Sequence, residues 1–86
     1  MTLEILDPDD FLADGMLRQD EFLDRALRYD WDRFRGKKVL VRGCSSGIIP
    51  PWVYMIITAK VSPIARSVRF GNEHDNIVIS RSGTEA

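Results

Sequence analysis

The sequence contains one cysteine, Cys44, and one histidine, His74. A single cysteine cannot form a disulfide within the chain, which favours a reducing compartment. A closed zinc site normally takes four ligands, and one cysteine with one histidine supplies two of them. We therefore expect no internal disulfide, no metal and no cofactor, and we expect a cytoplasmic location.

Several other signals are missing. The longest apolar run, residues 48–57, is shorter than the roughly 20 residues that cross a bilayer. The first residues contain no basic segment of the kind that opens a signal peptide. The small-residue loop at residues 43–47 lacks the Gly-Lys-Ser/Thr of a P-loop. The arginine of a phosphatase-type cysteine loop is also absent, because Pro50 stands there. We expect no membrane association.

The charges are unevenly divided along the chain. Residues 1–34 hold ten acidic and four basic residues, a net charge of −6, whereas residues 35–86 hold eight basic and three acidic residues, a net charge of +5. The two parts can pack together and cancel, or the second can present a basic surface to an anionic partner. Because no nucleic-acid-binding motif is present, nucleic-acid binding is the less favoured interpretation. The basic set consists of Arg35, Lys37, Lys38, Arg42, Arg66 and Arg69.

The composition is that of one small globular domain. Eighty-six residues with 44% hydrophobic and 29% charged residues are enough for a single core. We therefore expect one domain over residues 1–86, with residues 80–86 as a polar, disordered tail. From Asp20, the apolar residues Phe22, Leu23, Ala26 and Leu27 recur with helical spacing and predict an amphipathic helix.

The remaining pattern predicts a strand–helix–strand core. Residues 39–41 are an uninterrupted apolar run, typical of a strand buried on both faces. Residues 51–61 have almost no polar side and predict a largely buried helix, while residues 67–70 alternate as a strand does. Residues 2–6 and 76–80 predict further short strands. The predicted fold class is therefore a small α/β domain with a parallel βαβ core, a covering N-terminal helix and a further short strand.

One segment resembles a known family. Gly43-Cys44-Ser45-Ser46-Gly47-Ile48-Ile49-Pro50-Pro51-Trp52-Val53-Tyr54-Met55 is similar to the Cys-Ser…Val-Pro-x-Trp-Ala-Tyr-Met segment of a bacterial domain-of-unknown-function family, number twenty-four eighty. The likeness continues in residues 22–34, where Asp30-Trp31 resembles the end of a family helix, and in residues 68–75, which resemble its Val-x-Phe-Gly-x-x-x-Asp turn. The resemblance implies no activity. Family members tend to be longer, with a second, related half.

Candidate chemistry gathers where the two parallel strands are predicted to end. Cys44 follows the first strand and His74 follows the second, so both are expected at one edge of the sheet. Cys44, His74 and Asp75 are the candidate nucleophile, base and orienting acid, with Glu73 as an alternative acid. The alternative interpretation is that Cys44 is inert packing. Loop amides there can also hold an anion, which makes the candidate ligand-binding residues Gly43, Ser45, Ser46, Gly47, Asn72 and Glu73.

Our leading functional hypothesis is a cytoplasmic binding or interaction module with an unknown partner that self-associates. The alternatives are a thiol-dependent enzyme or redox sensor that uses Cys44 with His74, and nucleic-acid binding through a basic surface. We expect Trp31, Trp52 and Tyr54 to be packing residues. A homodimer is favoured slightly, because a two-stranded parallel sheet needs cover on both faces and the longer relatives supply a second half within one chain.

Overall fold

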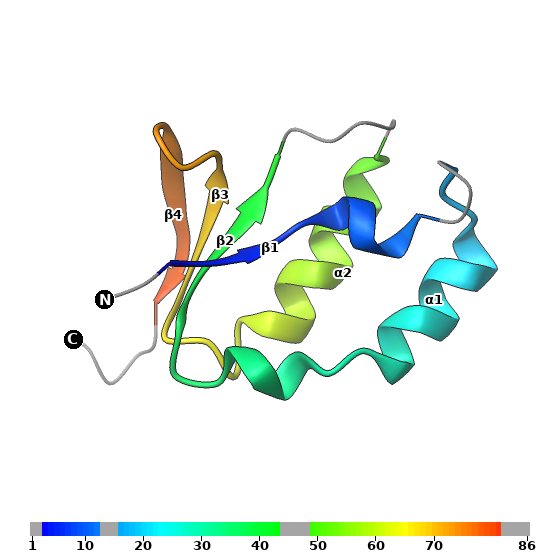
Figure 1. The fold of residues 1–86 in the computed structure, drawn as a ribbon, viewed down its shortest axis with the longest axis horizontal. Coiled ribbons are helices and arrows are strands. Elements are labelled where there is room, and N and C mark those ends of the chain that lie inside the picture. Colours follow the sequence, from blue (N-terminus) through cyan, green and yellow to red (C-terminus); the bar gives the residue numbers. More distant parts are fainter. Residues whose placement is uncertain (1–2, 13–15, 44–48, 82–86) are drawn as a thin grey trace.

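The structure of the chain, a computed structural model, describes residues 3–12, 16–43 and 49–81. Three helical segments separate the first two strands, one helix separates the second strand from the third, and the last two strands follow each other directly (Figure 1). The strands are β1 (Leu3–Leu6), β2 (Lys38–Arg42), β3 (Ser67–Gly71) and β4 (Asn76–Arg81); the α-helices are α1 (Gln19–Arg28) and α2 (Pro51–Val61); the short 3₁₀ helices are η1 (Pro8–Phe11) and η2 (Trp31–Phe34).

The four strands form one mixed sheet in the order β1-β2-β3-β4. β1, β2 and β3 run parallel, and β4 runs antiparallel to β3. The predicted strand–helix–strand unit is confirmed, because β2, α2 and β3 form it, and so is the predicted α/β fold class. β1 is the predicted strand at one edge, and β4 lies at the other. β4 is the predicted strand at residues 76–80 extended by one residue, Arg81, which the sequence prediction assigned to a polar tail.

Short-range chemistry explains how the first helical turn begins. Asp7 accepts a hydrogen bond on its side chain from the backbone N–H of Asp9, at 3.0 Å. This is an N-cap interaction, and Pro8 follows at the first helical position, where the missing N–H is not needed. The chain therefore turns sharply out of β1 and carries Phe11 inward, where it is buried.

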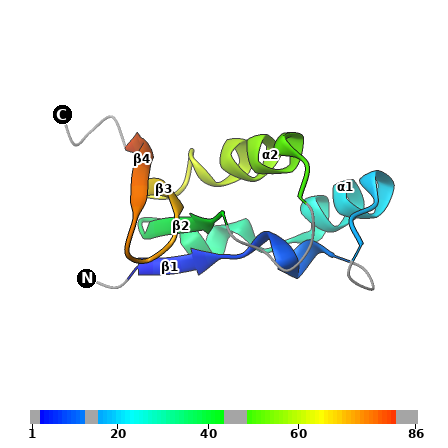
Figure 2. The same ribbon diagram turned by 90° about the horizontal axis from the view of Figure 1, so that it is seen from above.

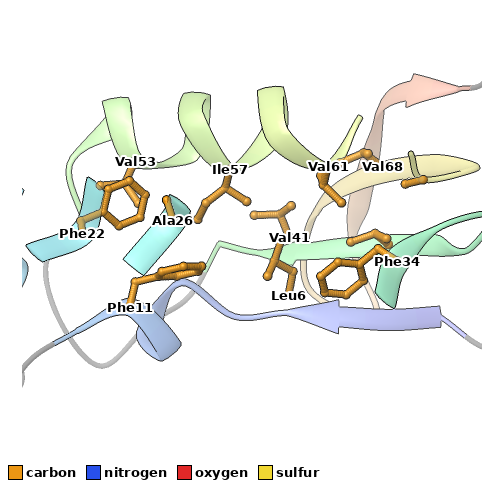
Figure 3. Close-up of a cluster of buried hydrophobic side chains, with 12 residues drawn as sticks. Leu6, Phe11, Phe22, Ala26, Phe34, Val41, Val53, Ile57, Val61 and Val68 are labelled. Carbon is orange, nitrogen blue, oxygen red and sulfur yellow. The ribbon is translucent and has the colours of Figure 1, made fainter. Parts of the chain in front are cut away.

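The core lies between α2 and one face of the sheet. Figure 3 shows Ile57 and Val61 of α2 pointing toward Val41 of β2 and Leu6 of β1, with Val53 beside Phe22 of α1. All of these residues belong to one buried cluster. Val39 and Val68 belong to it as well. Figures 1 and 2 place α1 on the same side of the sheet as α2. The N-terminal helix therefore extends the core sideways and does not cover the second face.

Two predictions about helix burial are wrong in part. On α1, Phe22 and Ala26 are buried, but Leu23 is exposed and Leu27 has 77% of its surface in solvent. The apolar stripe is wider than the surface that η1 and α2 offer to it. On α2, which was predicted to be largely covered, Met55 is 71% exposed. α2 contacts the sheet and α1 on one side, and no described element covers the opposite side.

The second face of the sheet carries charged side chains around one leucine. Leu40 lies opposite Ile5 on one side and Arg69 on the other, and it is fully buried although it lies outside the main cluster. Lys38 and Arg42 lie two residues before and after it, so they project to the same face. β2 is thus buried on both faces, as predicted. A helix covers its first face, whereas neighbouring side chains of the sheet cover its second face.

Candidate functional site

The carboxyl ends of β2 and β3 meet, as the candidate site requires. The backbone N–H of Gly43 donates to the carbonyl of Gly71 at 2.9 Å. A Cβ at Gly43 would lie 2.9 Å from Cζ of Phe70, so a larger residue would displace that ring. The predicted site residues Cys44, Ser45, Ser46 and Gly47 lie outside the described residues.

The turn from β3 to β4 is organised by Asn72. Its Oδ1 accepts hydrogen bonds from the backbone N–H groups of His74 and Asp75, both at 2.8 Å. Its carbonyl accepts from Nδ2 of Asn76 at 2.8 Å. The Asn72 side chain therefore holds the turn, which leaves His74 and Asp75 exposed to solvent. Gly71 precedes the turn with φ +138°, and a Cβ there would collide with the carbonyl of Asp75.

Arg42 connects this turn to the N-terminal part of the chain. Nη2 of Arg42 donates to Oε2 of Glu73 at 2.7 Å, and Nη1 lies 3.8 Å from Oδ2 of Asp7. The guanidinium is half-buried between the two carboxylates. Arg42 and Glu73 thus form an ion pair with each other. A ligand that binds Glu73, or an anionic partner that binds Arg42, would have to compete with this ion pair.

The described part of the candidate site is a turn beside a pair of strand ends. The structure brings Gly43, Asn72, Glu73, His74 and Asp75 into one region, at the end of the sheet where β2 and β3 stop. The thiol hypothesis also needs the position of Cys44, and it stays a prediction. Within the described ranges, no three His, Cys, Asp or Glu side chains gather as metal ligands would.

The aromatic residues Trp31, Trp52 and Tyr54 pack as predicted. Nε1 of Trp31 donates to the carbonyl of Ala26 at 2.7 Å. The ring of Trp52 meets that of Phe22 edge-on at 5.5 Å, and Tyr54 meets Phe70 at 5.2 Å. Such contacts fix α2 against α1 and β3.

A hollow of about 560 Å³ lies between η1 and α1. Burial raises the pKa of the Tyr29 hydroxyl beside it, and among the described residues that hydroxyl finds no hydrogen-bond partner. Burial also raises the pKa of Asp10, and the nearby charge of Asp7 acts in the same direction. Acidic and basic side chains of α1 surround the rest of this hollow. Because both signs of charge are present, the hollow favours neither an anionic nor a cationic ligand.

An apolar groove lies between α2 and the β3–β4 hairpin, with a volume of about 460 Å³. Among the described residues that line it, Arg69 alone is charged. Beside the groove, β4 exposes Ile77 at 62% and Ile79 at 47% of their surface. Val78, which is 38% exposed, lies opposite Arg69 and so projects to the other face of the sheet. The apolar lining includes Val41, Tyr54, Met55, Val68, Phe70 and Ile79. Sequence reasoning missed this surface, because it assumed that α2 was covered.

A smaller hollow of about 270 Å³ lies at the other end of the sheet, where β2 and β3 begin. It is lined by Lys38, Arg66, Ser67, Arg69 and Arg81, and we call it the basic hollow. Three of these residues belong to the basic set noted in the sequence. Arg81 and Ser67 were missed, and the signal that identifies them is strand register, because Lys38 pairs with Ser67 and Ser67 with Arg81.

Together, the sheet, the one-sided helices and these surfaces define a small mixed α/β domain with an apolar groove and a basic hollow. Over residues 2–81 the chain matches the family described as "Protein of unknown function (DUF2480)". The chain belongs to that family, and the resemblance stated from its sequence is confirmed. No curated protein and no solved structure matches the chain. In the part of the chain that the structure describes, no helix is long and apolar enough to cross a membrane.

Proposed function

We propose that the protein is an interaction module that binds a second copy of itself through β4 and the apolar groove. The observation that carries this proposal is the exposure of Ile77, Val78 and Ile79 on an edge strand. Edge strands present unpaired backbone N–H and C=O groups, and natural proteins usually protect them with lysine, proline or a covering segment. β4 has no charged residue before Arg81, and no described strand pairs with its outer edge.

The groove adds a second apolar contact beside that edge. Ile77 lies opposite Phe70 in the sheet, and Phe70 and Ile79 both line the groove. On the other side of the groove, Met55 of α2 has 71% of its surface exposed. A partner strand at β4 would place apolar side chains over this groove, and removal of such surface from water gives about 25 cal/mol for each Å².

The chemistry of the surface favours a second copy as the partner. The exposed side chains beside the groove, Met55, Ile77 and Ile79, are uncharged, so two identical surfaces meet without like-charge repulsion. Antiparallel pairing of β4 with the β4 of another copy is compatible with a two-fold axis, which is the commonest symmetry of homo-oligomers. The pairing would continue the sheet from one protomer into the other.

Sedimentation equilibrium tests the proposal. We expect a mass near twice the 9.8 kDa of one chain at high micromolar concentration. Ile77→Lys places a charge in the centre of the surface and should shift the protein to a monomer. Leu27→Lys is the matched control, because Leu27 is exposed on α1, away from the groove. A wild-type protein that stays at 9.8 kDa, or equal loss of the dimer in both variants, would overturn the proposal.

A further inference from the structure

The basic hollow combines one concave surface with one sign of charge. Four of its five lining residues are basic and the fifth is Ser67. It lies where β2 and β3 begin, and so at the opposite end of these strands from Gly43 and Gly71. It is therefore separate from the candidate thiol site.

Strand register explains why these side chains converge. Lys38, Ser67 and Arg81 lie opposite one another on three adjacent strands, and residues directly opposite in a sheet project to the same face. Arg69 follows Ser67 by two residues, so it projects to that face as well. Lys38, Ser67 and Arg69 are half-buried and Arg81 is exposed at the rim. The two central strands β2 and β3 and the edge strand β4 together build this arrangement.

Three of the four positive charges of the hollow, those of Lys38, Arg69 and Arg81, lack an acidic partner among the described residues. No ion pair joins Lys38, Arg69 or Arg81 to a described acidic side chain, and Nη1 of Arg69 donates to the neutral Oδ1 of Asn76 at 2.9 Å. Arg42, on the same face, is instead paired with Glu73 at 2.7 Å. Like charges held close together repel, and a partly buried site screens this repulsion less than open water does. An anion in the hollow would remove that repulsion.

We propose that the basic hollow binds the phosphate group of a small phosphorylated molecule. Guanidinium groups bind phosphate oxygens in a bidentate manner, lysine adds a compact positive charge, and the Ser67 hydroxyl is a further donor. The cations converge on one concave space of about 270 Å³ and do not form a track, whereas nucleic-acid binding uses cations spread along a backbone. This site goes beyond the proposed self-association, and Arg69 is the one lining residue that the basic hollow shares with the apolar groove.

Calorimetric titration of the full chain with pyrophosphate and with glycerol 3-phosphate tests the proposal. We expect saturable binding with one site per chain for at least one of the two probes. Lys38→Gln and Arg81→Gln each remove one charge from the hollow and should weaken binding roughly tenfold or more, since a hydrogen bond to a charged group is worth that much. Lys60→Gln is the matched control, because Lys60 is exposed on α2 and does not line the hollow. It should leave the affinity unchanged within about twofold, because distant surface charges are screened.

The outcomes are distinct. Absence of saturable binding to both probes overturns the proposal, and so does equal weakening by Lys38→Gln and Lys60→Gln, which would indicate diffuse attraction. A parallel titration with duplex DNA tests the other source of phosphate groups. DNA binding that pyrophosphate does not displace overturns the proposal of a small-molecule site. Thermal melting without ligand checks folding. If Lys38→Gln does not fold, Arg81→Gln decides the question, because Arg81 is exposed at the end of β4.

Discussion

The phenylalanines of the N-terminal half are buried, whereas several large aliphatic residues of β4 and α2 are exposed. In the N-terminal half, Phe11 lies edge-on to Phe22 at 5.2 Å and stacked with Trp31 at 5.9 Å, and Phe11, Phe22 and Phe34 are buried. On the hairpin and α2, Ile77, Ile79 and Met55 face solvent.

The difference shows that hydrophobicity alone does not identify the core of a small domain. The aromatic residues of η1, α1 and η2 pack against one another, because these three short segments, which connect β1 to β2, turn back on one another. β4 has one neighbouring strand and α2 packs on one side, so their remaining apolar residues stay uncovered. Buried aromatic residues therefore support the free energy of unfolding, whereas the exposed aliphatic ones are available for contact with a partner.

The largest expected effect compares the two regions directly. Phe22→Ala should lower the free energy of unfolding by about 3–5 kcal/mol, because it leaves a cavity between Phe11 and Trp52. Ile77→Ala should change it by less than about 0.5 kcal/mol, since Ile77 is 62% exposed. Urea titration at low protein concentration measures both. Similar losses from the two variants would show that the hairpin is part of the stability core.

A smaller effect is expected at the glycine that ends β3. Gly36 and Gly71 both have positive φ, +71° and +138°, but a Cβ at Gly36 meets no atom within 4 Å while a Cβ at Gly71 collides with the carbonyl of Asp75. Gly36→Ala should cost about 1–2 kcal/mol from backbone strain alone. Gly71→Ala should cost more, because the turn must also shift. Thermal unfolding of the two variants checks this order, and an equal cost would mean that the turn adapts without loss.

The smallest effect concerns the acidic residues that precede α1. The pKa of Asp10 is raised above its ordinary value of 3.8, first by burial and then by the charge of Asp7. The folded state therefore binds this proton more tightly than the unfolded state, so the ionised carboxylate lowers stability at neutral pH and the cost fades as pH falls. Asp10→Asn should raise the melting temperature slightly at pH 7.

The pH dependence of that difference is the informative measurement. The advantage of Asp10→Asn should decrease as pH falls through the raised pKa, and it should be absent below about 3.8, where the wild-type carboxyl is protonated in both states. Melting curves of both proteins over this pH range give the result. An advantage that grows toward acidic pH would mean that the Asp10 carboxylate stabilises the fold.

Part of the candidate site was predictable from the sequence. The order of strand, loop, helix and strand correctly predicted that β2 and β3 run parallel and end at the same edge of the sheet, where the structure places Gly43 beside Gly71. The role of Asn72 was not predictable, since its side chain closes the turn through backbone groups of His74 and Asp75. The pairing of Arg42 with Glu73 was equally hidden, because 31 residues separate them in the chain.

The sequence by itself determined the α/β class, the family and the parallel β2–α2–β3 unit, since each depends on local pattern along the chain. The tertiary structure decided which apolar residues are covered and which basic residues meet. Burial of Leu27 and Met55 depends on whether another element reaches them, and the basic hollow depends on the register that aligns Lys38, Ser67 and Arg81 across three strands. Both are long-range relations between segments, which residue spacing along the chain does not encode.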